Sequence, residues 1–71
     1  MNRIFMILKI NGEKRYVPTL ESIRQLLRHL EIGEDRIAVE VNSRILPRKE
    51  WDRTPVNDQD RIEIVQFVGG G

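Results

Sequence analysis

The sequence contains no cysteine and a single histidine, His29. Without cysteine the chain forms no disulfide, offers no thiolate to a metal ion and supplies no thiol nucleophile. One histidine makes a histidine-rich metal site unexpected, and His29 falls beside the polar side of a predicted helix, where we interpret it as a solvated surface residue. We therefore expect a protein with no bound metal and no cysteine nucleophile.

Long apolar runs and a one-sided charge are also missing. No stretch is long enough to span a membrane, and the first residues lack the apolar segment of a secretory signal. The 12 basic and 11 acidic residues leave a net charge of +1 and are mixed along the chain, whereas nucleic-acid-binding domains carry a basic patch. We expect a cytoplasmic protein that binds neither nucleic acid nor membrane.

A chain of 71 residues is long enough for one domain. Such a short chain buries only about 60% of its unfolded surface, so the apolar residues must be well patterned to build a core. Five short stretches have the β-branched or alternating composition of strands. They cover residues 3–10, 13–17, 37–41, 45–46 and a last strand from residue 62 onward. Both faces of the first stretch are largely apolar, which predicts a central strand.

Turn and helix signals separate these strands. Asn11-Gly12 predicts a type I′ hairpin turn between the first two strands. Thr19 is the predicted N-cap of a helix of about three turns, and Gly33 ends it. Trp51 is interpreted as a lid over one end of the core rather than a ligand-stacking residue. The helix is expected to pack through the apolar stripe Leu20, Ile23, Leu26, Leu27 and Leu30.

The predicted element order is β-β-α-β-β-β, with one helix on one face of a mixed sheet of about five strands. This is an α+β chain in which the first and last strands lie side by side and parallel, the ubiquitin-like β-grasp architecture. We expect residues 1–68 to form the β-grasp domain and residues 69–71 to form a flexible C-terminal glycine tail.

The final glycines, Gly69, Gly70 and Gly71, are poor stabilisers because glycine loses the most conformational entropy on ordering. A segment without Cβ atoms is suited to enter a narrow channel. The reactive group it presents is the α-carboxylate of Gly71, which we hypothesise to be the working group of the protein. A frayed end or an added terminus is the alternative interpretation of these glycines.

The residues that carry a family resemblance are 10–13, 39–42, 42–51 and 54–65 and the terminal glycines. Through them the chain resembles the ThiS family, the sulfur-carrier proteins of thiamine biosynthesis, over essentially its whole length. Pro47-Arg48 followed by Trp51 is the most discriminating part. One departure is Gln59, where the family usually has glycine between two aspartates, and it leaves the type of that turn open.

The resemblance implies a carrier that is a co-substrate and not an enzyme. An E1-like adenylyltransferase of the ThiF type would use ATP and Mg²⁺ to adenylate Gly71, and no cofactor would be bound by the carrier itself. Sulfur from a cysteine desulfurase route would then convert the acyl adenylate to a thiocarboxylate. A thiazole synthase of the ThiG type would take up this sulfur.

Two related functions stay open at this stage. Molybdopterin-type sulfur carriers share the activation chemistry but tend to carry prolines before the terminal glycines, where this chain has Gln66-Phe67-Val68. A ubiquitin-like protein modifier would join its terminus to lysines, and a plain interaction domain would not use it.

A docking surface is also predicted. If the first and last strands are neighbours, apolar side chains from both are expected to meet on the face of the sheet away from the helix, and such a patch usually marks a partner site. A basic residue near the fourth strand is expected to pair with acidic groups of the activating enzyme. The predicted partner-binding residues are Phe5, Ile7, Val65, Phe67, Val68 and Arg48.

Overall fold

The computed structural model describes residues 4–67. Val68, Gly69, Gly70 and Gly71 lie outside the described residues, so the predicted division into a domain of residues 1–68 and a glycine tail stays a prediction. The elements follow the predicted order. They are β1 (Phe5–Ile10), β2 (Glu13–Pro18), α1 (Ile23–His29), β3 (Ile37–Val41), β4 (Arg44–Leu46), the 3₁₀ helix η1 (Arg48–Glu50) and β5 (Arg61–Gln66).

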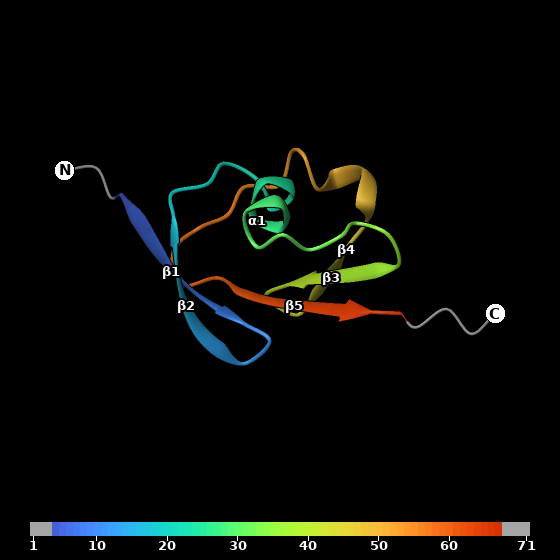
Figure 1. The fold of residues 1–71 in the computed structure, drawn as a ribbon, viewed down its shortest axis with the longest axis horizontal. Coiled ribbons are helices and arrows are strands. Elements are labelled where there is room, and N and C mark those ends of the chain that lie inside the picture. Colours follow the sequence, from blue (N-terminus) through green and yellow to red (C-terminus); the bar gives the residue numbers. More distant parts are fainter. Residues whose placement is uncertain (1–3, 68–71) are drawn as a thin grey trace.

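The five strands form one mixed sheet in the order β2-β1-β5-β3-β4. β1 and β5 are parallel neighbours, as predicted, and the other pairs are antiparallel. Helix α1 covers one face, and the opposite face carries no element of the described chain (Figure 1). We call this uncovered side the open face. The arrangement confirms the predicted β-grasp architecture.

The core lies between α1 and the sheet. It combines alternate residues of the strands, such as Leu8 and Ile62, with the apolar side of α1. Trp51 is 2% exposed, and its ring nitrogen donates to the carbonyl oxygen of Leu46 at 3.1 Å. Burial of this indole with its polar atom satisfied confirms the structural role predicted for Trp51.

Helix α1 begins later than the sequence pattern suggests. Its N-cap is Ser22, whose hydroxyl accepts a hydrogen bond from the N–H of Gln25 at 3.2 Å. The predicted cap Thr19 was wrong, and α1 has seven residues, about two turns instead of three. Ser22 and Gln25 have the spacing of a capping box, a sequence signal that competes with the apolar stripe.

Left-handed backbone conformations occur at Glu31 and Arg36, between α1 and β3, and in three further turns. Asn11 and Gly12 have φ values of 49° and 83°, which confirms the predicted type I′ hairpin. Asn42 and Ser43 also have positive φ between β3 and β4. Gln59 has a φ of 74°, so the turn before β5 keeps a conformation that favours glycine although the residue is glutamine.

Candidate functional site

Two side-chain clamps hold β5, the strand that precedes the terminal glycines. Asn11 forms the first: its side-chain oxygen accepts from the N–H of Ile64 at 2.7 Å, and its side-chain nitrogen donates to the carbonyl oxygen of Ile64 at 3.2 Å. Regular pairing of β1 with β5 ends at Ile10 and Ile62. The Asn11 amide therefore extends the hydrogen bonding toward the end of β5.

The second clamp fixes the start of β5. Asp60 is buried, and its two carboxylate oxygens accept from the N–H of Asn57 at 2.8 Å and from the side chain of Asn42 at 3.0 Å. The side-chain oxygen of Asn42 in turn accepts from the N–H of Arg61 at 2.9 Å. These bonds give hydrogen-bond partners to the buried carboxylate and to backbone N–H groups of the turn. They fix where the strand begins.

The predicted docking residues face the side of the sheet that was expected. Phe5, Val65 and Phe67 are 48%, 51% and 55% exposed, and Ile7 is half-buried. They lie on the open face because their neighbours in sequence, such as Met6 and Ile64, pack into the core. Their orientation is confirmed, and Val68 lies outside the described residues.

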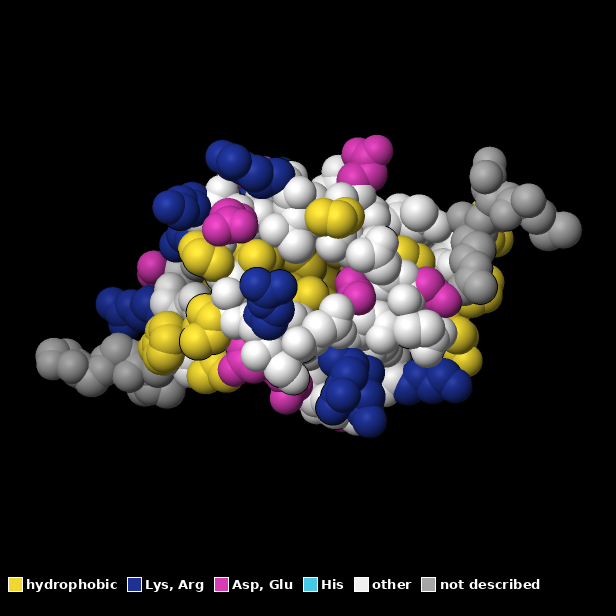
Figure 2. All heavy atoms as spheres, turned by 180° about the vertical axis from the view of Figure 1, so that it is seen from behind, with side chains coloured by type: hydrophobic (Ala, Val, Ile, Leu, Met, Phe, Trp, Pro, Cys, Tyr) yellow, Lys and Arg dark blue, Asp and Glu magenta, His cyan; other side chains and the backbone are white. Residues whose placement is uncertain are grey.

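These side chains do not form one patch, however, and this part of the prediction was wrong. The parallel register pairs Lys9 with Arg61, and the N–H of Gln59 donates to the carbonyl oxygen of Ile7. Ile7 is therefore level with Gln59, six residues before Val65, which is about 20 Å along the strand. Figure 2, which views the molecule from the side, shows hydrophobic side chains near both ends of the molecule and others between them.

Each end of the open face instead builds its own apolar patch. Near the start of β1, Ile7 pairs with Tyr16 across the hairpin, and the rings of Phe5 and Tyr16 lie 5.8 Å apart. We call Phe5, Ile7 and Tyr16 the hairpin-side patch, because they lie on the β1–β2 hairpin, at the end away from its Asn11-Gly12 turn.

Near the end of β5, Ala38 pairs with Val65, and Ile45 on β4 is 75% exposed. Ile45 faces the same side because it pairs with Glu40, which in turn pairs with Glu63 on β5. We call Ala38, Ile45, Val65 and Phe67 the tail-side patch. It adjoins the residues that lead to the glycine tail.

Charged side chains separate the two patches. Lys9 stands between Lys14 on β2 and Arg61 on β5, its direct partners in the two neighbouring strands, and we call these three the basic row. Glu40 and Glu63 are directly opposed on β3 and β5, and we call them the acidic pair. Like charges in direct opposition destabilise a sheet by about 0.2–1 kcal/mol per pair.

Arg48 is held by contacts within the chain. Its guanidinium lies 5.3 Å from the ring of Trp51 and 3.8 Å from Glu34. Arg24 lies 5.4 Å from the same ring and pairs with Glu34 and Asp52. With 58% of its side chain exposed, Arg48 still presents charge to solvent. Its contact with a partner stays a prediction, and its contact with Trp51 is one that sequence reasoning missed.

The part of the chain between residues 4 and 67 offers no cluster of three or more histidine or acidic side chains that could hold a metal ion. Within the same range, no helix has the length and apolar character needed to cross a membrane. What the described chain provides is a rigid, clamped strand and a patterned face beside it.

Comparison with known proteins identifies the fold and the family. The crystal structure of a thiamine biosynthesis protein (ThiS) from Geobacter metallireducens superimposes with a TM-score of 0.80 and 35% identity, over 93% of this chain and all of that one. The architecture is that of a β-grasp protein. The model of the ThiS family matches residues 8–71, and the chain belongs to this family.

Similar sequences carry three kinds of name. The chain is 32% identical to the sulfur carrier protein ThiS of Bacillus subtilis over 92% of its own length and all of that protein. It is 42% identical to the uncharacterized protein ycf40 of Porphyra purpurea over 90% of both chains. It is also 41% identical to the thiazole synthase of Paramagnetospirillum magneticum, over 93% of this chain but only 20% of that protein.

Proposed function

We propose that the protein carries sulfur for thiamine biosynthesis as a thiocarboxylate at Gly71, the last residue of the sequence. The observation that carries the proposal is the family match, which runs from residue 8 through all three terminal glycines. A relative named as a sulfur carrier aligns over its full length. The clamped β5 supports the proposal because it presents the following residues from a rigid central strand.

The chemistry requires activation because a carboxylate is a poor electrophile at neutral pH. A carboxylate oxygen of Gly71 would attack the α-phosphorus of ATP, and pyrophosphate would leave with its charge held by Mg²⁺ in an E1-like partner. A sulfur nucleophile would then add to the acyl carbon, and AMP would leave with the electron pair. Hydrosulfide gives the thiocarboxylate directly. A persulfide from a cysteine desulfurase route gives an acyl disulfide, which a thiol must reduce.

In this scheme the carrier supplies no acid, base or metal ligand, and we infer that it is not itself an enzyme. ATP and Mg²⁺ belong to the activating partner. The carrier contributes the reacting terminus and a surface that places it. We propose the tail-side patch as the main contact with the activating enzyme, because Val65 and Phe67 are exposed apolar groups close to the reacting end.

A thiazole synthase is the proposed acceptor of the sulfur. The support is that two proteins named thiazole synthase each contain a stretch, about 20% of their length, that aligns with over 90% of this chain. A carrier-like domain within the same polypeptide as the acceptor would keep the two at high effective concentration. We propose that this chain delivers its sulfur to such an acceptor in the cytoplasm.

Intact-mass measurement tests the proposal. The chain is incubated with ATP, Mg²⁺, an E1-like adenylyltransferase of the ThiF type and hydrosulfide. We expect its mass to rise by the difference between one sulfur and one oxygen atom, and only when ATP is present. Attachment to lysines of other proteins, or no change while a known ThiS is converted in a parallel reaction, would contradict the proposal.

A further inference from the structure

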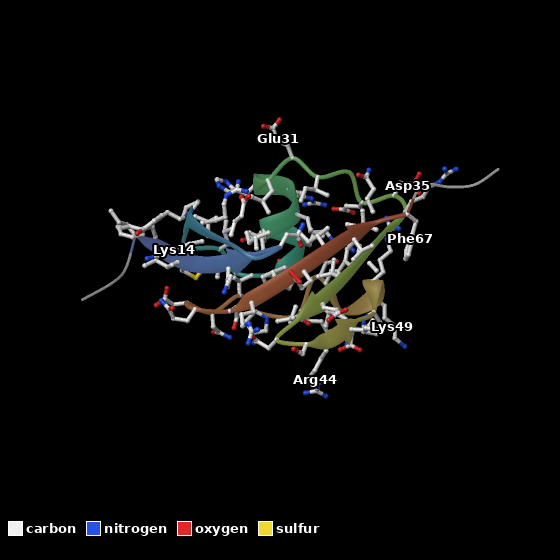
Figure 3. The ribbon with its side chains drawn as sticks, turned by 90° about the horizontal axis from the view of Figure 1, so that it is seen from below. Lys14, Glu31, Asp35, Arg44, Lys49 and Phe67 are labelled. Carbon is white, nitrogen blue, oxygen red and sulfur yellow. The ribbon has the colours of Figure 1, made fainter. Side chains whose placement is uncertain are left out.

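The open face is divided into four bands along the direction of its central strands. From the start of β1 to the end of β5 they are the hairpin-side patch, the basic row, the acidic pair and the tail-side patch. The bands run obliquely across the sheet: the first two begin on β2 and β1, and the last two extend over β3, with Ile45 on β4 beside Glu40. Figure 3 looks onto this face, with Lys14 near one end of the molecule and Phe67 at the other. The order is therefore apolar, positive, negative, apolar.

The two charged bands lie next to each other, but no ion pair joins them among the described residues. Lys9 and Arg61 line a hollow together with Glu40 and Glu63. Even so, none of these four, nor Lys14, enters an ion pair among the residues that the structure describes. Within each band the charges are alike and directly opposed, which works against the stability of the isolated sheet.

When the same four bands are placed against this face in reverse order, opposite charges meet and apolar patches meet. A second copy turned by a two-fold rotation about an axis in the plane of the face presents the four bands in the opposite order. The axis crosses the strands obliquely, so that β1 of one copy lies over β5 of the other. The basic row of each copy then meets the acidic pair of the other, and each hairpin-side patch meets a tail-side patch. We propose that the open face binds the open face of a second copy of this chain, in a symmetric and isologous pair.

The available surface suits a weak pair. A stable interface takes about 800 Å² from each partner, and the whole surface of this chain is 5334 Å². One face of a two-layer domain is of the right order, but charged groups fill its centre and apolar groups its ends, the reverse of a tight interface. We expect a dissociation constant on the order of 10–100 µM at low salt.

Self-association goes beyond the proposed function, and it is measured independently of sulfur transfer. It implies that self-association covers the tail-side patch and competes with docking on the activating enzyme. Nothing in the dimer requires Gly71, ATP or sulfur. A failure of thiocarboxylate formation would therefore leave the self-association result unchanged, and the reverse also holds.

Two charge reversals test the proposal by sedimentation equilibrium. Lys9→Glu and Glu63→Lys each place like charges across the two-fold axis, so each variant alone should dimerise at least about tenfold more weakly than the parent chain. In an equimolar mixture, Glu at position 9 of one chain meets Lys at position 63 of the other, and Lys9 of the second chain meets Glu63 of the first. The mixture should recover the parent's affinity as a heterodimer.

The design separates association from folding. Each reversal removes a like-charge opposition within its own sheet, so the variants should unfold at denaturant concentrations equal to or higher than the parent. Glu31→Lys is the matched control for the charge change, because Glu31 follows α1 on the covered side of the sheet and extends beyond the edge of the molecule in the view onto the open face (Figure 3). This variant should dimerise like the parent.

Either of two results would overturn the proposal. The first is a parent chain that stays monomeric up to about 1 mM at low salt. The second is a mixture of the two reversals that associates no better than either variant alone. If the chain stays monomeric while both reversals slow adenylation by an E1-like enzyme, the charged bands serve that enzyme and not a second copy.

Discussion

The helix side of the sheet and its open side differ in how completely their side chains are compensated. On the helix side, Ile62 and Val39 are fully buried, and no buried side-chain nitrogen or oxygen between residues 4 and 67 lacks a hydrogen-bond partner. On the open side, like charges oppose each other at Lys9 with Lys14 and at Glu40 with Glu63. One side stabilises the fold, and the other keeps exposed charged and apolar groups that are available to a partner.

β5 shows the difference within a single strand. Its alternate residues Ile62 and Ile64 belong to the core or pack against it, whereas Glu63 and Val65 are exposed. Because side chains alternate with a period of two, one strand can serve stability on one face and recognition on the other. Substitutions in β5 therefore compare the two sides at nearly constant position.

The largest expected effect is a loss of stability when a core residue on the helix side is truncated. Ile62→Ala should lower the free energy of unfolding by about 3 kcal/mol, because it removes a fully buried side chain and leaves a cavity. Val65→Ala, three positions further along, should cost less than about 0.5 kcal/mol. Urea unfolding of both variants measures the difference. If the alanine variant is unfolded in water, Ile62→Val, with a cost of about 1 kcal/mol, still allows the contribution of this core position to the free energy of unfolding to be measured.

Equal costs at positions 62 and 65 would show that the open face is also structural.

A smaller effect is expected at the clamp that joins the two regions. Asn11→Ala should cost about 2 kcal/mol, because it removes both hydrogen bonds to Ile64 and places alanine at a φ of 49°. Asn11→Gly keeps the turn but not the amide and should cost about 1 kcal/mol. Hydrogen exchange at the Ile64 amide should be faster in both variants. Unchanged exchange at Ile64 would mean that the clamp does not hold the end of β5.

The smallest expected effect is a gain at the turn before β5. Gln59→Gly should raise the free energy of unfolding by about 0.5–1 kcal/mol, because glycine adopts the φ of 74° without steric cost. For a domain of this size, each 1 kcal/mol raises the melting temperature by about 4–8 °C. Gln59→Ala is the control and should change little, because alanine has the same left-handed penalty. A loss of stability with glycine would mean that the Gln59 side chain itself stabilises the turn.

Local patterns predicted most of the fold. Asn11-Gly12 predicted the hairpin, and the alternation of apolar residues predicted β3 and β5. The parallel β1–β5 pair followed from the element order. The helix start was missed because an apolar residue, Leu20, extends the stripe beyond the Ser22 cap. At that point side-chain hydrogen bonding, and not hydrophobic periodicity, decides where the helix begins.

The register of β1 against β5 could not be predicted in the same way. It depends on contacts between residues about fifty positions apart, such as the bond from the N–H of Ile7 to the carboxylate of Asp58 at 2.8 Å. Alternation fixes which face a side chain occupies, but it leaves the offset along the strand open. For this reason the facing of Phe5, Ile7, Val65 and Phe67 was predicted correctly, and their meeting in one patch was not.

The central claim is that the fold and the reacting group are separable, and removal of Gly70 and Gly71 tests it most directly. The measurement is the intact mass of the truncated chain after incubation with ATP, Mg²⁺, an E1-like adenylyltransferase and hydrosulfide, with urea unfolding as the control for folding. We expect the unfolding midpoint to stay within error of the parent, because residues without side chains bury little surface. Thiocarboxylate formation should be lost, since a misplacement of about 1 Å can already cost a hundredfold in rate. Normal sulfur uptake by the truncated chain would contradict the account.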